Sequence, residues 1–414
     1  MKRIGTAALA LLLGAACGST TAAPSSATPT ISHAPTAERL VVEGDDATTA
    51  IDVATRKTVA RLPGGVLSPS GDLIVRANGA AGTKKTVVQG WSLAGDTVFG
   101  LALGDDYSFP NAYGAAPSGF SPNGKWLVLV ARDSKESRFA VIDVANKKVA
   151  RTLALSSRFT FDAIHDDGNG MYLIEHPTAS STAYNVRFYD LQAGVLRPDI
   201  IFDKTQIAQY DPTVGLMDGT FHVSVMPKKG DWTYGLYMRP NGAPFVHALN
   251  VPGRYAQCIV DLAGTWTAAS MFSMALTDDG RALYVVDTAG GTVSVIDALA
   301  QKVVRRATFA TRSTVGDPRS ATMVIAHDGS RLYASAATGI AMLQTSDLSL
   351  RGWLAPDIAA RSLAISSDNA RLYALAGDAV VVIDIASGRV VAKLADAPGA
   401  RSVHVLAAND VSRR

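Results

Sequence analysis

The sequence predicts an all-β protein, a single β-propeller built from four-stranded antiparallel blades. Three observations lead to this fold class. From residue 38 onward the chain repeats itself, each repeat consists of short apolar runs separated by polar turns, and no segment has a convincing helical period.

Three of the repeats align closely. They read ALTDDGRALYVVDTAGGTVSVIDALAQKVV, VIAHDGSRLYASAATGIAMLQTSDLSLRGW and AISSDNARLYALAGDAVVVIDIASGRVVAKL. An aromatic residue of the expected second strand falls at Tyr284, Tyr333 and Tyr373, at spacings of 49 and 40 residues. Four earlier copies diverge more, between residue 64 and the first of these repeats.

Each unit predicts four strands in order. A short apolar strand leads into a turn of Asp, Asn, Ser and Gly, which suit turn conformations. An alternating strand rich in aromatic or β-branched residues follows, such as RLYALA. After a variable polar loop, the third strand ends in Ile-Asp or a similar pair, and a tight turn leads to a fourth strand such as RVVAKLA.

The two ends of the repeat region are complementary. Residues 39–62 supply the second to fourth strands of a blade, whereas residues 401–408 supply only a first strand. Joining them completes a blade and removes two exposed sheet edges. Counting the joined blade gives eight, which we favour over the alternative of seven.

The repeats resemble the YVTN-type propeller repeats, relatives of WD40-like propellers. The resemblance is carried by DDGR-LYV and by TVSVID followed by KVV, and it is strongest over residues 272–396. The resemblance implies a propeller fold, but it does not specify a function. Members include surface-layer and export proteins, and related propellers include lactonases and quinoprotein dehydrogenase subunits.

An aspartate ends the third strand in five of the repeats. A carboxylate at this place can accept hydrogen bonds from turn amides and fix the hairpin, so we interpret the repetition as a fold device. The divergent copy has Thr345 at the matching position; the five aspartates are Asp52, Asp143, Asp190, Asp297 and Asp384.

The N-terminal segment predicts export and lipid attachment. Residues 1–17 combine a basic start, an apolar run and Leu13-Gly14-Ala15-Ala16-Cys17, which resembles a bacterial lipobox with Cys17 as the lipidated residue. Plain secretion, with cleavage for instance after Ala23, is the alternative.

Residues 18–37 are mainly Ser, Thr, Ala and Pro and carry no charged residue, so we expect a flexible tether there. The propeller is expected at 38–408, followed by a tail at 409–414. The expected location is the outer face of the bacterial cytoplasmic membrane.

Charge and motifs exclude several classes of function. Without Lys2 and Arg3 the chain has 37 basic and 36 acidic residues, which does not supply the basic surface that nucleic acid requires. The spacing Gly119 to Lys125 imitates a phosphate-binding loop but lies in a turn between strands. The turn at residues 165–170 has oxygen ligands for Ca²⁺ but too few of them, so we interpret it as a polar turn. We expect no cofactor, no metal and no catalytic residue.

Four arginines remain as candidate ligand-binding residues. Arg361 and Arg401 share an Arg-Ser step at the start of first strands, and Arg158 and Arg319 fall two residues earlier in their repeats. Because two residues are one strand period, we expect all four to project with the same parity around one mouth of the central channel. Four guanidiniums there favour an anionic ligand.

Two functions of different class follow. The first is a tethered binding or scaffold propeller for a protein or a small anionic ligand outside the membrane. The alternative is an extracytoplasmic enzyme of the lactonase or quinoprotein-dehydrogenase kind, with its site in the channel. The repeats themselves do not choose between the two.

Overall fold

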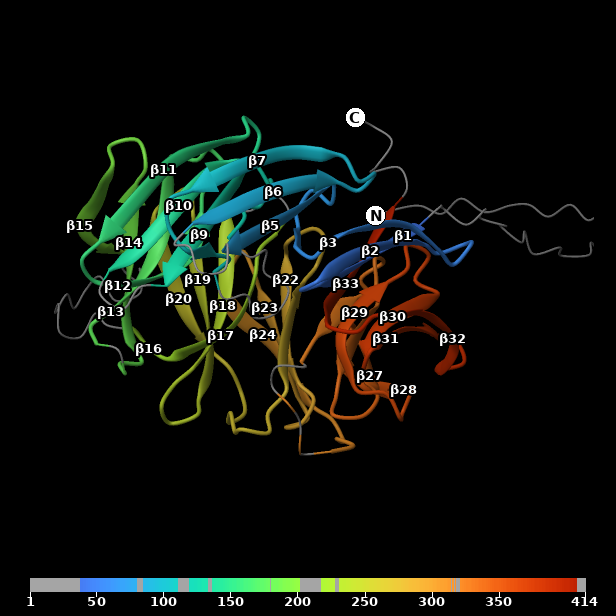
Figure 1. Ribbon diagram of the computed structural model, residues 1–414. Coiled ribbons are helices and arrows are strands. Elements are labelled where there is room, and N and C mark those ends of the chain that lie inside the picture. The colour runs from blue at the N-terminus through green and yellow to red at the C-terminus, as the bar shows by residue number, and fades with distance from the viewer. Residues whose placement is uncertain are drawn as a thin grey trace, which may run out of the picture. The chain divides into compact units, whose positions relative to one another are not determined.

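The computed structural model describes residues 38–79, 85–110, 119–132, 136–178, 180–201, 217–227, 231–313, 315, 317 and 321–407. The regular structure in these ranges consists of β-strands (Figure 1). The strands form eight antiparallel blades in a ring, so the propeller and the favoured blade number are both confirmed. The search for a membrane span among the described residues found no helix of sufficient length and apolarity.

The first half of the ring holds blades 1 to 4. Blade 1 is ordered β3-β2-β1-β33, with β1 (Glu38–Gly44), β2 (Ala47–Asp52), β3 (Lys57–Pro63) and β33 (Ala400–Ala407). Blade 2 contains β4 (Val66–Leu67), β5 (Leu73–Gly79), β6 (Thr86–Ser92) and β7 (Thr97–Leu103). Blade 3 contains β8 (Tyr107–Ser108), β9 (Trp126–Arg132), β10 (Ser137–Asp143) and β11 (Lys148–Leu155). Blade 4 contains β12 (Arg158–Ile164), β13 (Gly170–His176), β14 (Ala183–Asp190) and β15 (Val195–Ile201), and the short β16 (Met217–Asp218) pairs with β14.

The second half holds blades 5 to 8. Blade 5 contains β17 (Thr220–Val225), β18 (Trp232–Met238), β19 (Pro244–Asn250) and β20 (Tyr255–Asp261). Blade 6 contains β21 (Phe272–Leu276), β22 (Ala282–Asp287), β23 (Thr292–Asp297) and β24 (Lys302–Thr308). Blade 7 contains β25 (Met323–Ile325), β26 (Arg331–Ser335), β27 (Ile340–Gln344) and β28 (Leu350–Leu354). Blade 8 contains β29 (Ala360–Ile365), β30 (Arg371–Ala376), β31 (Ala379–Asp384) and β32 (Arg389–Asp396).

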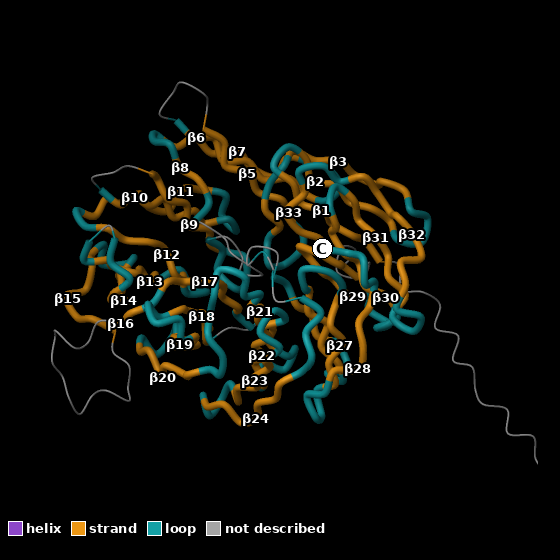
Figure 2. The backbone as a smooth tube through the Cα atoms, turned by 90° about the horizontal axis from the view of Figure 1, so that it is seen from below, coloured by secondary structure: helices purple, strands orange, loops and turns teal. Residues whose placement is uncertain are grey.

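The first strand of each blade is the inner strand. Figure 2 shows β12, β17, β21, β29 and β33 around the middle of the ring, with strands such as β15, β24 and β32 on the outside. The inner strand of blade 1 comes from the C-terminus: β33 pairs with β1 from Glu38↔Ala407 to Gly44↔Ala400. The predicted closure by N- and C-terminal strands is therefore confirmed.

The polar turn after the inner strand is a hydrogen-bonded unit, which explains its composition. In blade 6 the hydroxyl of Thr277 donates to Asp279 Oδ1 over 2.6 Å and accepts the amide of Ala282 over 3.0 Å. Asp279 also accepts the amide of Arg281 over 3.0 Å. Gly280 completes the turn at φ 70°, a conformation that favours glycine.

The aspartates that end the third strands have the predicted structural role. In each, a carboxylate oxygen accepts a backbone amide from the following turn at 2.7 to 2.9 Å; the pairs are Asp52 with Thr55, Asp143 with Asn146, Asp190 with Ala193, Asp297 with Ala300 and Asp384 with Ser387. Thr345 instead donates to the carbonyl oxygen of Gly329 over 2.6 Å.

The core lies between blades and uses the second-strand aromatics. Tyr284, Tyr333 and Tyr373 are at most 5% exposed. Apolar side chains of adjacent blades pack on them, as Leu332 and Ala334 of blade 7 do in the cluster that holds Tyr284. Burial of this apolar surface at every blade boundary is the main favourable term for the ring.

Candidate functional site

The structure describes three of the four candidate arginines and brings two of them together. Arg361 is the second residue of β29, and Arg401 is the second residue of the neighbouring inner strand β33. Arg158 begins β12 and is exposed, but blade 4 lies four blades from blade 8. Arg319 and the lipid-attachment residue Cys17 lie outside the described residues.

Arg361 and Arg401 occupy β-bulges, which sequence reasoning did not identify. The register of β29 passes from Ala360 to Ser362, and that of β33 from Ala400 to Ser402, so each arginine is an extra residue without a partner in the second strand. A third bulge, in blade 5, places His222 in the same way, near the start of β17. A bulge turns its extra side chain away from the regular alternation.

Each of these three side chains contacts the start of the next blade's inner strand. Arg361 donates from Nη2 to the carbonyl of Ala400 over 2.9 Å, and from Nη1 to Gly377 over 2.5 Å. Arg401 donates from Nη2 to the carbonyl of Gly65 over 2.8 Å, just before β4. The Nε2 of His222 lies 3.0 Å from the carbonyl oxygen of Phe272, the first residue of β21. The bulge residues therefore join neighbouring blades.

The two guanidiniums keep donors that these contacts do not use. Arg361 makes three hydrogen bonds, and Arg401 makes one hydrogen bond and one ion pair, from Nη1 to Asp45 Oδ1 over 3.2 Å. A guanidinium has five N–H donors. Two donors of Arg361 and three of Arg401 therefore have no partner among the residues that the structure describes, while the backbone contacts hold both side chains.

A polar cluster continues from Arg401 along β33. Ser402 donates to Glu43 Oε2 over 2.6 Å, and His404 Nε2 lies 3.1 Å from the Ser402 hydroxyl and 3.5 Å from Glu43 Oε1. The amide of Leu67 in β4 donates to Glu43 Oε1 over 2.5 Å. Glu43 thus links the closing strand to blade 2. In a serine-hydrolase triad, one ring nitrogen of the histidine contacts the serine and the other contacts the carboxylate. Here Nε2 of His404 makes both contacts, so the three residues do not form such a triad.

Charge coupling changes the pKa values of this pair. Burial acts to lower the pKa of His404, but the carboxylate of Glu43 outweighs it and raises that pKa above its usual value. For Glu43, burial acts to raise the pKa, whereas the charge of His404 and the hydrogen bonds lower it overall. The side chain of His404 is 42% exposed, whereas that of Glu43 is 10% exposed, so the imidazole is the solvent-facing member of the pair.

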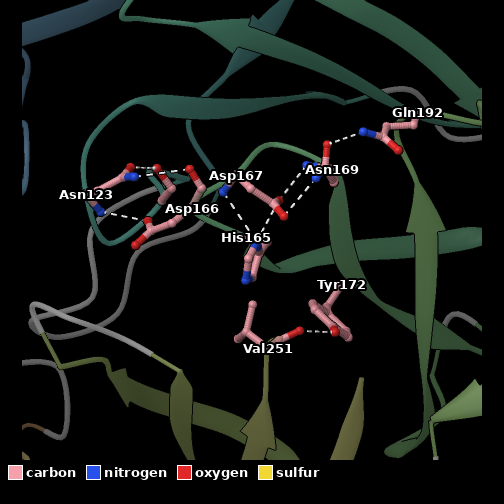
Figure 3. Close-up of polar contacts among 9 residues, drawn as sticks. Asn123, His165, Asp166, Asp167, Asn169, Tyr172, Gln192 and Val251 are labelled. Carbon is pink, nitrogen blue, oxygen red and sulfur yellow. Dashed lines mark hydrogen bonds and ion pairs between the residues drawn. The ribbon is translucent and has the colours of Figure 1, made fainter. Parts of the chain in front are cut away.

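The turn at residues 165–170, considered above for Ca²⁺, uses its oxygens within the fold (Figure 3). Asp166 Oδ1 accepts the amide of Asn123 from blade 3 over 2.8 Å. Asp167 Oδ1 lies 2.5 Å from His165 Nδ1 and accepts the amide of Asn169 over 2.8 Å. No group of three or more His, Cys, Asp or Glu that could hold a metal is found within the described part of the chain. This turn joins blades 3 and 4.

Sequence reasoning missed the inner-strand bulges, and only the bulge in β12 leaves a signal in the apolar pattern. In β12, Phe159 and Phe161 pack in the same core as Ile164, although two-residue alternation puts Ile164 on the other face. That break in parity locates a bulge at Asp162. The bulges at Arg361 and Arg401 lie at strand starts, where too few residues precede them to show a break.

Comparison with known proteins supports the fold. No protein-family model matches the sequence, and no curated protein matches it. Apo AztD from Citrobacter koseri has a TM-score of 0.58 at 13% identity over 89% of this chain and 98% of its own. Dihydro-heme d1 dehydrogenase NirN in complex with DHE has a TM-score of 0.57 at 13% identity over 91% and 76%. The Dos1 propeller has a TM-score of 0.52 at 8% identity over 85% and 93%. At such identities the likeness concerns architecture alone: the chain is an eight-bladed β-propeller.

Proposed function

We propose that this chain is a lipid-anchored, extracytoplasmic binding propeller. Its ligand is a small anion with carboxylate or phosphate groups, and the site lies where β29 and β33 start. The YVTN-type resemblance of the repeats and the lipobox at Cys17 support this proposal from the sequence.

One observation carries the proposal: two arginines on adjacent inner strands are held by backbone carbonyls and still have donors without a partner within the described part of the chain. Arg361 is fixed by Ala400 and Gly377, and Arg401 by Gly65. A held guanidinium loses less side-chain entropy when it binds, so more of its interaction with an oxyanion appears as affinity. The amide of Val403 donates to Ser362 Oγ over 3.1 Å, which ties the two strands together.

Titration calorimetry on the full chain in detergent tests the site. Citrate and inorganic phosphate are the probes, at low and high NaCl. We expect binding that weakens with salt and that falls about tenfold in Arg401→Gln, since a charged hydrogen bond contributes about 1.5–3 kcal/mol. Arg389→Gln is the matched control, because Arg389 is an exposed arginine at the start of the outer strand β32. Equal affinity in Arg401→Gln and the parent, or no binding of either anion, contradicts the anionic site.

The membrane anchor is tested separately. In cells fed a labelled fatty acid, the parent should carry the label and remain with the membrane fraction. Cys17→Ser should lose the label and be released or left uncleaved. Labelling and membrane retention that both persist in Cys17→Ser contradict lipid attachment at Cys17.

A further inference from the structure

The hairpin between β1 and β2 places a carboxylate beside the proposed anionic site. Asp45 is exposed in the turn after Gly44, and its Oδ1 lies 3.2 Å from Nη1 of Arg401. Arg401 also donates from Nη2 to the carbonyl of Gly65 over 2.8 Å. Of these two acceptors, only the carboxylate of Asp45 is charged. It presents to the guanidinium the same chemical group as an anionic ligand with a carboxylate.

Close backbone packing holds this hairpin against the segments that flank the site. The amide of Gly64 donates to the carbonyl of Asp46 over 2.9 Å. A Cβ on Gly64 would lie 2.0 Å from the carbonyl oxygen of Asp45, and a Cβ on Gly44 would lie 3.2 Å from that of Gly399. Glycine at both positions therefore lets the turn approach the connection from β3 to β4 and the connection into β33. The backbone that carries the carboxylate is thus fixed beside the site.

The contact between Asp45 and Arg401 is an exposed ion pair, which a competing anion can replace. The side chain of Asp45 is 74% exposed, and that of Arg401 is 44% exposed. Solvent and salt screen a pair at this exposure, so it adds little to stability. The hydrogen bonds of Arg401 to Gly65 and of Arg361 to Ala400 involve backbone carbonyls and do not depend on the ion pair. Both guanidiniums therefore stay in place when the pair breaks.

We propose that Asp45 is an internal competitor of the anionic ligand. In the empty site its carboxylate occupies Nη1 of Arg401, and a bound carboxylate or phosphate group takes over this donor while Asp45 turns into solvent. The inference rests on the anionic site proposed above and adds its regulation: Asp45 lowers the affinity of the site for anions. An anion has to break the ion pair to use Nη1, and the negative charge of Asp45 repels a second negative charge nearby.

Asp45→Asn tests the competition by titration calorimetry on the full chain in detergent, with citrate and inorganic phosphate as probes. Asparagine keeps the size of the side chain and removes its charge. We expect both anions to bind about two- to fivefold more tightly, since this is the range that the contribution of an exposed ion pair corresponds to. The gain should shrink at high NaCl, because salt screens the pair.

Asp46→Asn is the matched control. Asp46 is the adjacent exposed aspartate in the same turn, and its carboxylate makes no ion pair with the part of the chain that the structure describes. This variant removes the same charge from the same hairpin, so it measures the general effect of charge on anion binding. We expect a larger gain in Asp45→Asn than in Asp46→Asn. Equal gains in the two variants, or no gain in Asp45→Asn, overturn the proposal.

The effect of Asp45 should also depend on Arg401. When Arg401→Gln is already present, Asp45→Asn should change the affinity for citrate no more than Asp46→Asn does, because the contested donor is gone. An undiminished gain there overturns the competition. Failures of the two proposals differ: citrate binding that Asp45→Asn leaves unchanged overturns only the role of Asp45, whereas no binding in either the parent or Asp45→Asn overturns the anionic site and this role together.

Discussion

At the scale of the residue, the same feature of the inner strands, a β-bulge, holds hydrogen-bond donors in three blades and a carboxylate in a fourth. The bulges of β17, β29 and β33 hold His222, Arg361 and Arg401, which can donate a hydrogen bond to a carbonyl of the next blade. The bulge of β12 holds Asp162, which when ionised can only accept one. The side chain therefore decides whether such a bulge can donate a hydrogen bond that joins two blades.

The contacts of Arg361 predict a measurable loss of stability. Arg361→Met keeps the aliphatic stem but removes three hydrogen bonds to the carbonyls of Ala400 and Gly377. We expect a loss of about 1–2 kcal/mol in the free energy of unfolding, because the group is partly exposed and charged hydrogen bonds contribute about 1.5–3 kcal/mol when buried. Urea denaturation measures it, with Arg389→Met as the control. A loss no larger than that of the control would mean that these contacts do not stabilise the ring.

The pair of His404 and Glu43 predicts a pH dependence of known sign. The pKa of His404 is raised, so its contribution to stability is complete below the unfolded value of about 6.5 and is lost as pH rises through the folded pKa. The pKa of Glu43 is lowered, so its contribution is lost as pH falls through that pKa.

His404→Gln should therefore cost more stability at pH 5.5 than at pH 8.5, as measured by urea denaturation. His176 supplies the contrast, because burial lowers its pKa and its substitution should show the opposite trend. A cost for His404→Gln that is greater at pH 8.5 would contradict the coupling.

At the scale of the element, the hairpin between third and fourth strands recurs with a different residue at its strained position. In the described blades this position has a positive φ, between 50° and 101°, and is glycine in three of them; the residues are Arg56, Gly95, Lys147, Gly194, Arg254, Gln301, Leu348 and Gly388. A non-glycine residue there costs about 1–2 kcal/mol relative to its usual conformation. In the five repeats that have it, the aspartate at the end of the third strand accepts turn amides and holds this conformation, and Asn250 does the same in blade 5.

Replacing one of these strained residues by glycine should stabilise the protein. Lys147 is exposed with φ 56°, so Lys147→Gly removes strain without removing a buried contact. We expect a gain of about 0.5–1 kcal/mol, since the added freedom of glycine in the unfolded chain offsets part of the relief. Thermal unfolding measures it. Lys148→Gly, one residue later at the start of β11, should destabilise, and a gain of equal size there would contradict the explanation by strain.

The sequence was a good guide to the elements and a partial guide to the site. Repeated alternation and turn residues locate the strands, because each blade must bury two faces and close three turns in the same way. The alignment of Arg361 with Arg401 was also correct, because each is the second residue of an inner strand and the extra residue of a bulge. The bulges themselves escaped, because one inserted residue at the start of a strand leaves the apolar pattern unchanged. The partnership of Glu43 with His404 joins residues from opposite ends of the chain, which no local pattern reveals.

At the scale of the whole molecule, stability depends on the seam where the chain's two ends meet. In blade 1, β33 supplies the inner strand, and it contributes Ser402 and His404 to the buried carboxylate of Glu43. It also donates the amide of Val403 to Ser362 of blade 8. Blades 8, 1 and 2 are therefore joined through this one strand.

Removing residues 401–414 tests this dependence on the seam. The deletion leaves β1 as an unpaired edge and deprives Glu43 of two partners, while Val403 no longer covers the core it shares with Tyr373. An unpaired edge beside exposed apolar surface promotes aggregation, and a buried carboxylate without partners is costly. We expect aggregation on expression, or loss of the single cooperative transition in thermal unfolding. A chain ending at Ala407 keeps all of β33 and is the matched control, which should unfold like the parent. If the chain ending at Ala400 unfolds with the same midpoint and cooperativity as that control, pairing of β1 with β33 does not hold the ring closed.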